Sequence, residues 1–163
     1  MKNEIVVRLF DSYANDLYRF ALSYVGIKQE AEDVVQNVYL KLLSKNVPIR
    51  KEYEKAFLFK MTANMCKDYL KSKKSDTMLN YDELEYLIDG EKDIDDEDRS
   101  FYHRLMSLKE IYRVPIFLHY YEGYTYGEIA KILKLGESAV AMRINRGKEE
   151  LKKKWRDQYG REY

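Results

Sequence analysis

The sequence predicts an all-α protein made of two small helical domains joined by an acidic linker. Apolar residues recur at spacings of three and four along most of the chain, and no stretch alternates strictly between apolar and polar residues. Only 2 prolines and 7 glycines occur among 163 residues, which argues against the many turns of an extensive sheet. The charge pattern adds the division into two domains, because a strongly acidic stretch separates two basic ones.

Charge divides the chain into three parts. Residues 1–71 hold 12 basic and 9 acidic side chains, residues 72–100 hold 4 and 11, and residues 101–163 hold 13 and 8. The net charges are therefore +3, −7 and +5. A stretch as acidic as the middle one does not bury itself cheaply. We therefore predict domains at 1–71 and 101–163, and a flexible linker at 72–100.

The first domain is expected to hold three helices. An apolar face runs from Val6 to Tyr24, and Gly26 supplies a stop. A second helix is expected at about 29–44 and a third at about 54–70. The residues expected to be buried are Val6, Leu9, Phe10, Tyr13, Leu17, Phe20, Ala21, Tyr24, Ala31, Val34, Val35, Val38, Tyr39, Leu42, Leu43, Phe57, Leu58, Met61, Met65 and Tyr69.

The second helix carries a polar face that is a candidate for protein binding. Asp33, Gln36, Asn37 and Leu40 fall opposite its apolar stripe. An acidic and amide face that contains an exposed leucine is unusual, and it suits a protein partner. An ordinary solvated helix face is the alternative.

The third helix carries a basic face that is a candidate for binding nucleic acid. Lys60, Asn64 and Lys67 lie opposite its core side, with Phe59 beside them. Lysine contacts phosphate, asparagine can read a base edge, and an aromatic ring can stack on an unpaired base. A soluble lysine face with a partly buried phenylalanine has the same composition, so both interpretations stay open.

The second domain contains the signals of a helix-turn-helix. Thr125 and Glu128 form a capping box that starts a helix at Tyr126. A turn at 134–136 then leads to a longer basic helix from about Glu137. A helical hairpin with a basic surface is the alternative. In a helix-turn-helix the first part of the second helix enters the major groove, which makes the candidate DNA contacts Ser138, Ala139, Met142, Arg143, Arg146 and Lys148.

Several classes of protein are not expected. No apolar run approaches the roughly 20 residues of a membrane-spanning helix, so we expect no membrane insertion. The single cysteine, Cys66, cannot form an internal disulfide, which suits the reducing cytoplasm. There is no phosphate-cradling glycine loop, nucleophile motif or cluster of metal ligands. We therefore expect neither enzymatic activity nor a metal or other cofactor.

Blocks in both domains resemble the extracytoplasmic-function sigma factors, a family of subunits of bacterial RNA polymerase. Residues 17–21 (LYRFA), 30–36 (EAEDVVQ), 56–64 and 68–70 are similar to conserved region two of that family. Residues 112–130 and 140–148 are similar to region four. The blocks stand in the order and spacing of the family and cover nearly the whole chain except the linker.

The resemblance implies an alternative sigma factor that binds core RNA polymerase and directs promoter-specific transcription initiation. Region two would bind the polymerase clamp through the face that includes Asp33, and would capture the melted −10 strand near Lys60, with the loop at 45–53 shaping a base pocket. Region four would bind the duplex −35 element of promoter DNA. The resemblance also raises an anti-sigma factor as a partner. A stand-alone helix-turn-helix regulator is the alternative, and it would dimerise on a palindrome.

Three departures from the family pattern fall in the helix-turn-helix of the second domain. Lys134 stands where a turn glycine is common, and Gly136 follows at the cap position. Ala139 and Ala141 replace residues that are often polar. Base recognition is therefore expected to depend more on Arg143, apolar contacts and DNA shape.

Overall fold

The structure is a computed structural model, and it describes residues 2–45, 48–72 and 103–159. The chain divides into two compact units, one around helices α1 to α3 and the other around helices α6 to α8. The prediction of an all-α protein with two helical domains is confirmed. The acidic linker predicted at 72–100 lies outside the described residues except for Ser72. The linker and the domain boundaries therefore stay predictions.

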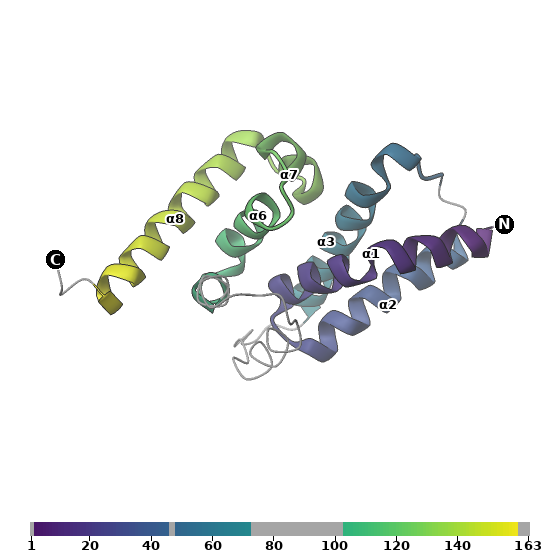
Figure 1. The fold of residues 1–163 in the computed structure, drawn as a ribbon, viewed down its shortest axis with the longest axis horizontal. Coiled ribbons are helices and arrows are strands. Elements are labelled where there is room, and N and C mark those ends of the chain that lie inside the picture. Colours follow the sequence, from purple (N-terminus) through teal and green to yellow (C-terminus); the bar gives the residue numbers. More distant parts are fainter. Residues whose placement is uncertain (1, 46–47, 73–102, 160–163) are drawn as a thin grey trace. The chain divides into compact units, whose positions relative to one another are not determined.

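Three α-helices and one short 3-10 helix form the first unit (Figure 1). They are α1 (Lys2–Val25), α2 (Lys28–Ser44), η1 (Lys51–Tyr53) and α3 (Glu54–Ser72). Helix α1 packs against both α2 and α3, and α2 also packs against α3. Gly26 adopts a φ of 77°, and its amide donates a hydrogen bond to the carbonyl of Leu22 at 2.8 Å. The first helix therefore ends where the glycine predicts.

The core of the first unit follows the predicted apolar stripes, but six residues that were expected to be buried are not. Four of them are half-buried, namely Tyr13, Phe57, Met65 and Tyr69, and two are exposed. Phe10 and Leu43 were expected to be buried but are 49% and 44% exposed. The ring of Phe10 lies against the edge of the α1–α2 contact, with its centroid 5.0 Å from that of Tyr39 in a T-shaped arrangement. Tyr39 is buried and donates its hydroxyl to the carbonyl of Leu9 at 3.1 Å. Its burial raises the pKa of the phenol.

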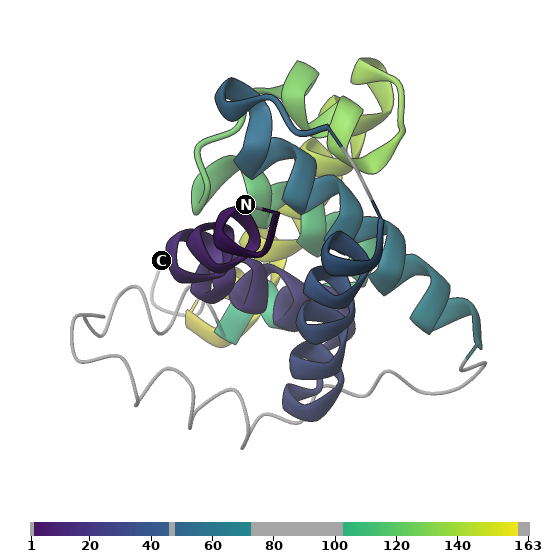
Figure 2. The same ribbon diagram turned by 90° about the vertical axis from the view of Figure 1, so that its right-hand side faces the viewer.

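A helical turn and three α-helices form the second unit, which Figure 1 and Figure 2 show from two directions. The helical turn spans 103–106, and the helices are α6 (Glu110–Tyr120), α7 (Tyr126–Leu133) and α8 (Glu137–Tyr159). Helix α6 packs along α8. The buried apolar residues of this unit include Leu105, Met106, Val114, Ile116, Phe117, Leu118, Ile129, Ala130, Ile132, Leu133, Val140 and Ile144.

None of the helices in the described parts of the chain is both long and apolar enough to cross a membrane.

Candidate nucleic-acid and polymerase interfaces

Helix α7 begins with the capping box that the sequence predicts. The amide of Glu128 donates to Oγ1 of Thr125 at 3.2 Å, and the amide of Thr125 donates to Oε1 of Glu128 at 3.0 Å. Two of the amides that the start of a helix leaves without partners are thereby satisfied. The helix runs from Tyr126 to Leu133. Both of its ends agree with the prediction.

The turn between α7 and α8 depends on an unusual backbone conformation at Lys134. This residue has φ 56° and ψ 50°, and it is the one residue other than glycine with a positive φ in the described parts of the chain. The amides of Lys134 and Leu135 both donate to the carbonyl of Ala130, the latter at 2.9 Å. The left-handed residue lets the chain satisfy that carbonyl and reverse direction within three residues. Gly136 directly precedes α8 at the cap position, where its carbonyl accepts from the amide of Val140 at 3.1 Å.

The predicted DNA contacts of α8 all lie on its accessible surface. Ser138, Met142 and Arg146 are exposed, and Met142 is 48% exposed. The other three, Ala139, Arg143 and Lys148, are half-buried. Asn145, which was not among the predicted contacts, is also exposed on this helix. The helix therefore offers basic, amide and apolar side chains together over its first three turns.

Gly147 lets α6 and α8 approach each other, a role that the sequence pattern did not predict. A Cβ atom built there would lie 2.4 Å from Cδ1 of Ile116 and 3.2 Å from Cβ of Tyr112. A side chain at this position would therefore require the side chains of Ile116 and Tyr112 on α6 to move. The sequence did contain a signal for this close contact, namely a glycine inside an otherwise regular basic helix. Such a glycine lowers the stability of the helix by about 1 kcal/mol relative to alanine, so its presence indicates a packing requirement.

The basic tail of α8 is partly engaged within its own unit. Nζ of Lys154 donates to the carbonyl and to Oγ of Ser107, at 3.0 and 2.9 Å. The guanidinium of Arg104 lies over the ring of Trp155, 4.6 Å from its centroid. These contacts hold the end of α8 against the residues that precede α6. Exposed tail cations are Lys152, Lys153 and Arg156.

The polar face of α2 is arranged as the sequence predicts. Asp33, Gln36, Asn37 and Leu40 are all exposed, and Leu40 is 60% exposed. They alternate with the buried residues of the same helix, so the four side chains occupy the side away from the core. An isobutyl group with most of its surface in water stands next to a carboxylate and two amides.

The structure corrects one of the four residues predicted on the basic face of α3. Phe59 is completely buried, and its ring centroid lies 4.9 Å from that of Phe20 on α1. It is a core residue without a free face for a base. Lys60 is exposed, whereas Asn64 and Lys67 are half-buried. The exposed aromatic ring near the start of α3 belongs to Tyr53 in η1, which is 60% exposed.

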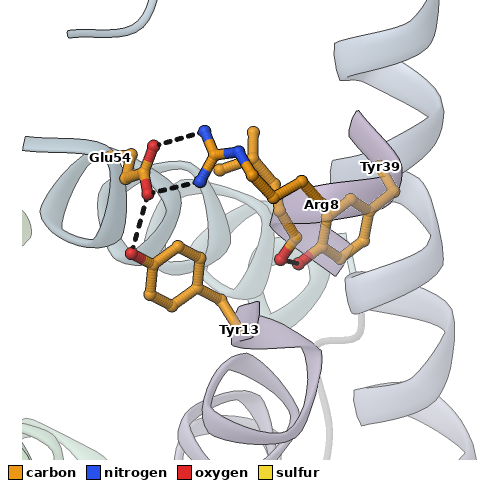
Figure 3. A network of polar contacts seen from close by, with 5 residues as sticks. Arg8, Tyr13, Tyr39 and Glu54 are labelled. Atoms are coloured by element: carbon orange, nitrogen blue, oxygen red, sulfur yellow. Dashed lines mark hydrogen bonds and ion pairs between the residues drawn. The ribbon is translucent and has the colours of Figure 1, made fainter. Parts of the chain in front are cut away.

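Polar contacts to Glu54 tie the start of α3 to α1 (Figure 3). Nη1 and Nη2 of Arg8 each donate to the Glu54 carboxylate at 2.9 Å, and the Tyr13 hydroxyl donates to the same carboxylate at 2.9 Å. Glu54 is only 6% exposed. The hydrogen bonds from Arg8 hold the pKa of this carboxyl below its usual value, against the opposing effect of burial. The network fixes the residue that directly follows η1, so it also anchors the end of the loop predicted to shape a base pocket.

A three-helix bundle followed by a helix-turn-helix with an exposed basic helix is typical of a modular DNA-binding protein. Family models agree with this class. The model described as Sigma-70 region 2 matches residues 9–75, and the model described as Sigma-70, region 4 matches residues 98–151.

Curated relatives support the same assignment, and a solved structure shares the fold. RNA polymerase sigma factor SigV of Bacillus subtilis (strain 168) is 28% identical over 143 residues, covering 87% of this chain and 86% of the relative. The ECF RNA polymerase sigma factor SigX of the same organism is 28% identical over 158 residues, covering 89% and 80%. A co-crystal structure of the sigma factor RpoE with the anti-sigma factor NepR from Bartonella quintana matches with a TM-score of 0.63 at 19% identity, covering 93% and 94%.

The chain belongs to the extracytoplasmic-function family of sigma factors. It is an alternative sigma factor that directs transcription initiation, and the reading as a stand-alone regulator is not favoured. Proteins of this class are transcription regulators rather than enzymes.

Proposed function

We propose that the second unit binds the −35 promoter element as duplex DNA through the first three turns of α8. The observation that carries this proposal is the complete helix-turn-helix, with a capped α7, a left-handed turn and an exposed basic α8. Arg143 and Arg146 suit guanine edges or phosphates, and Met142 with Ala139 suits the methyl group of thymine. Ser138 and Lys148 add polar contacts at the two ends of this surface.

The proposed partner of the first unit is core RNA polymerase, bound through the exposed face of α2. The curated relatives are themselves RNA polymerase sigma factors. Leu40 supplies apolar contact area, while Asp33, Gln36 and Asn37 supply polar contacts around it. An apolar centre with a polar rim is the usual composition of a specific protein interface.

A charge reversal tests this face. Asp33→Lys should weaken binding to purified core polymerase at least tenfold without changing the thermal melt, because the residue is exposed. Asp11→Lys is the matched control, since Asp11 is an exposed acid on α1. Equal affinities for the two variants, or a collapsed melt for Asp33→Lys, would remove α2 from the interface.

The melted −10 strand is proposed to bind beside α3. Lys60, Asn64 and Lys67 can contact its backbone and base edges. Phe59 is no longer part of this proposal, because its ring is buried. Tyr53 takes its place as the aromatic ring available for stacking, and it belongs to the loop at 45–53, of which residues 46 and 47 lie outside the described part.

Regulation by an anti-sigma factor is part of the proposal. The sigma factor RpoE was solved together with the anti-sigma factor NepR, and it shares the fold of this chain. We propose a regulatory partner of the same kind, acting on this protein in the cytoplasm. The chain itself is proposed to position polymerase and DNA without chemical catalysis of its own.

Footprinting with and without core polymerase tests the proposed function. Each unit offers only a small DNA-contacting surface, and two weak sites gain affinity when their separation is fixed. The free full-length chain should therefore bind promoter duplex weakly and open none of it at physiological salt. Addition of core polymerase should give a salt-resistant complex with permanganate-reactive thymines near the −10 element. A tight, symmetric footprint from the chain alone, unchanged by polymerase, would favour a stand-alone regulator.

A further inference from the structure

Lys148 is held by an aromatic ring from the neighbouring helix. Its Nζ lies 5.2 Å from the ring centroid of Tyr120, which occupies the last position of α6 and is 49% exposed. A hydrogen bond with the Tyr120 side chain raises the pKa of Lys148, and Tyr126 contributes in the same direction. Lys148 was a predicted DNA contact, whereas nothing in the sequence singled out Tyr120.

The packing of α6 on α8 explains why these two side chains meet. Tyr112, Ile116 and Tyr120 stand four residues apart and therefore share one face of α6. The first two contact the position where a Cβ of Gly147 would lie. Tyr120, one turn further along the same face, reaches Lys148, the residue that follows this glycine. The absence of a side chain at Gly147 thus brings the ring and the ammonium group together.

A lysine held in this way has a physical advantage in binding DNA. A free lysine side chain has four rotatable bonds, and it loses much of their rotamer freedom when it is ordered on DNA. Contact with an aromatic face restricts the stem before DNA arrives and leaves the ammonium group fully charged. Lysine acts as a point charge, so the ligand that it suits is a phosphate rather than a base edge. Its half-buried position, on the α6 side of α8, also differs from the exposed positions of Met142 and Asn145.

We propose that Tyr120 is a positioning residue of the DNA-binding surface, which holds the ammonium group of Lys148 ready to contact a backbone phosphate beside the recognition helix. This inference rests on the proposed binding of duplex DNA through α8. It extends that surface to the end of α6, outside the helix-turn-helix.

A double-mutant cycle on the full-length chain tests the role of Tyr120. The probe is a fluorescently labelled 30-base-pair duplex of random sequence, titrated at several salt concentrations. Lys148→Met should weaken binding about fivefold and reduce the slope of log K against log salt by about 0.9, because one phosphate contact is lost. Tyr120→Leu should weaken binding about threefold with an unchanged slope, because the charge of Lys148 remains. Tyr120→Phe keeps the ring and should retain most of the affinity.

The decisive comparison is made in the Lys148→Met background. There, adding Tyr120→Leu should cause no further loss, because the residue acts through the missing lysine. The same loss in both backgrounds, or no loss in either, would overturn the proposal and leave Tyr120 as a contact between α6 and α8 only. Thermal melts of Tyr120→Leu and Tyr120→Phe show whether the fold is kept. If the leucine variant unfolds, Tyr120→Gln provides the cycle, because it also removes the ring and the position is exposed.

A further variant separates this inference from the function on which it rests. Arg146 is exposed on α8 and is not one of the two residues of the Tyr120–Lys148 pair. If Arg146→Ala weakens binding while the Tyr120 variants do not, the positioning role fails and the DNA-binding surface stands. If none of these substitutions changes the affinity, α8 is not the DNA-binding surface, and both proposals fall.

Discussion

Helices α3 and α8 were predicted to present basic faces to DNA, and they differ in how much of those faces is accessible. All six predicted contacts of α8 are exposed or half-buried. On α3, Lys60 is exposed, two residues are half-buried, and Phe59 is completely buried. The difference follows from packing: α3 contacts both α1 and α2, whereas α8 packs chiefly along α6.

The comparison shows what spacing along a helix can and cannot decide. A helix that packs on one neighbour buries a single stripe, so the opposite residues are free to bind a ligand. A helix that packs on two neighbours buries a wider arc, and aromatic residues at the edge of the stripe fall into the core. Phe59 lies in this wider arc, where it meets Phe20. The number of neighbours is a tertiary property, and periodicity does not contain it.

The largest expected effect comes from removing the buried ring on α3. Phe59→Ala should destabilise the protein by about 3–5 kcal/mol, as is typical when a buried phenylalanine is truncated. The measurement is urea unfolding followed by circular dichroism. The matched variant is Tyr53→Ala, which removes an exposed ring and should change stability by less than about 0.5 kcal/mol.

A promoter-opening assay with core polymerase should give the opposite order, in which the variant of the exposed ring, Tyr53→Ala, has the specific defect. Tyr53→Ala should reduce permanganate reactivity near the −10 element while the fold remains intact, because stacking on an unpaired base is lost. If Phe59→Ala is instead stable and defective in opening, the original prediction for Phe59 is right and the accessible face of α3 is larger than the packing implies.

A second experiment tests the packing side of α8. Gly147→Leu should destabilise the second unit by about 2–3 kcal/mol, because the new side chain meets Ile116 and Tyr112. Gly127→Ala is the control: it lies inside α7, where an added Cβ has its nearest neighbour at 3.8 Å, so it should be neutral or stabilising. The single tryptophan, Trp155, lies in this unit and reports its unfolding by fluorescence. Equal midpoints for both variants would mean that α6 and α8 do not approach closely at Gly147.

The parts of the second unit that were predicted correctly depend on neighbours in the chain. The capping box of Thr125 and Glu128 lies within four residues, and so does the turn that ends at Gly136. Such interactions are fixed by local backbone geometry, so residue type and spacing predict them. The buried stripes of α1 and α2 were likewise visible as periodic patterns.

The features that were missed depend on residues far apart in the sequence. Arg8 and Glu54 are separated by 46 positions, and no local pattern pairs them. The contact of Gly147 with Ile116 and the exposure of Phe10 have the same origin. Each is decided by how two helices are oriented against each other, which a pattern along one helix does not specify.

A third experiment tests how firmly α3 is anchored at its start. Glu54→Gln removes the charge that binds Arg8, while retaining an oxygen that can accept from Tyr13. At pH 7 the expected loss of stability is about 1 kcal/mol, which is below the usual range for a hydrogen bond to a charged group because Arg8 is partly exposed and its charge is screened by solvent. Thermal or urea unfolding of wild type and variant measures this difference.

The pH dependence of the same variant carries a definite sign. The pKa of Glu54 is lowered in the folded protein from an ordinary value of 4.5. The stability that the ionised Glu54 contributes to the folded protein is therefore fully present above about pH 4.5. This stability is lost as the pH falls through the lower pKa that Glu54 has in the folded state. The stability difference between wild type and Glu54→Gln should shrink in that window. A difference that is constant from pH 7 down to pH 3 would assign the effect to packing rather than to charge.

The smallest expected effect concerns Lys134, the residue in the turn between α7 and α8. Here the test is whether the substitution raises or lowers the stability. Lys134 holds a left-handed conformation that disfavours a residue with a Cβ, so Lys134→Gly should relieve strain at the turn. Glycine also loses more conformational freedom on folding, which reduces the net gain to about 0.5 kcal/mol, or roughly 2–4 °C in Tm for a domain of this size. The matched control is Lys131→Gly. Lys131 is a solvent-exposed residue within helix α7, where a glycine should lower the stability by about 1 kcal/mol. The same substitution three residues apart should thus shift the melting temperature in opposite directions. If both variants are destabilised equally, the turn does not require a left-handed residue at position 134.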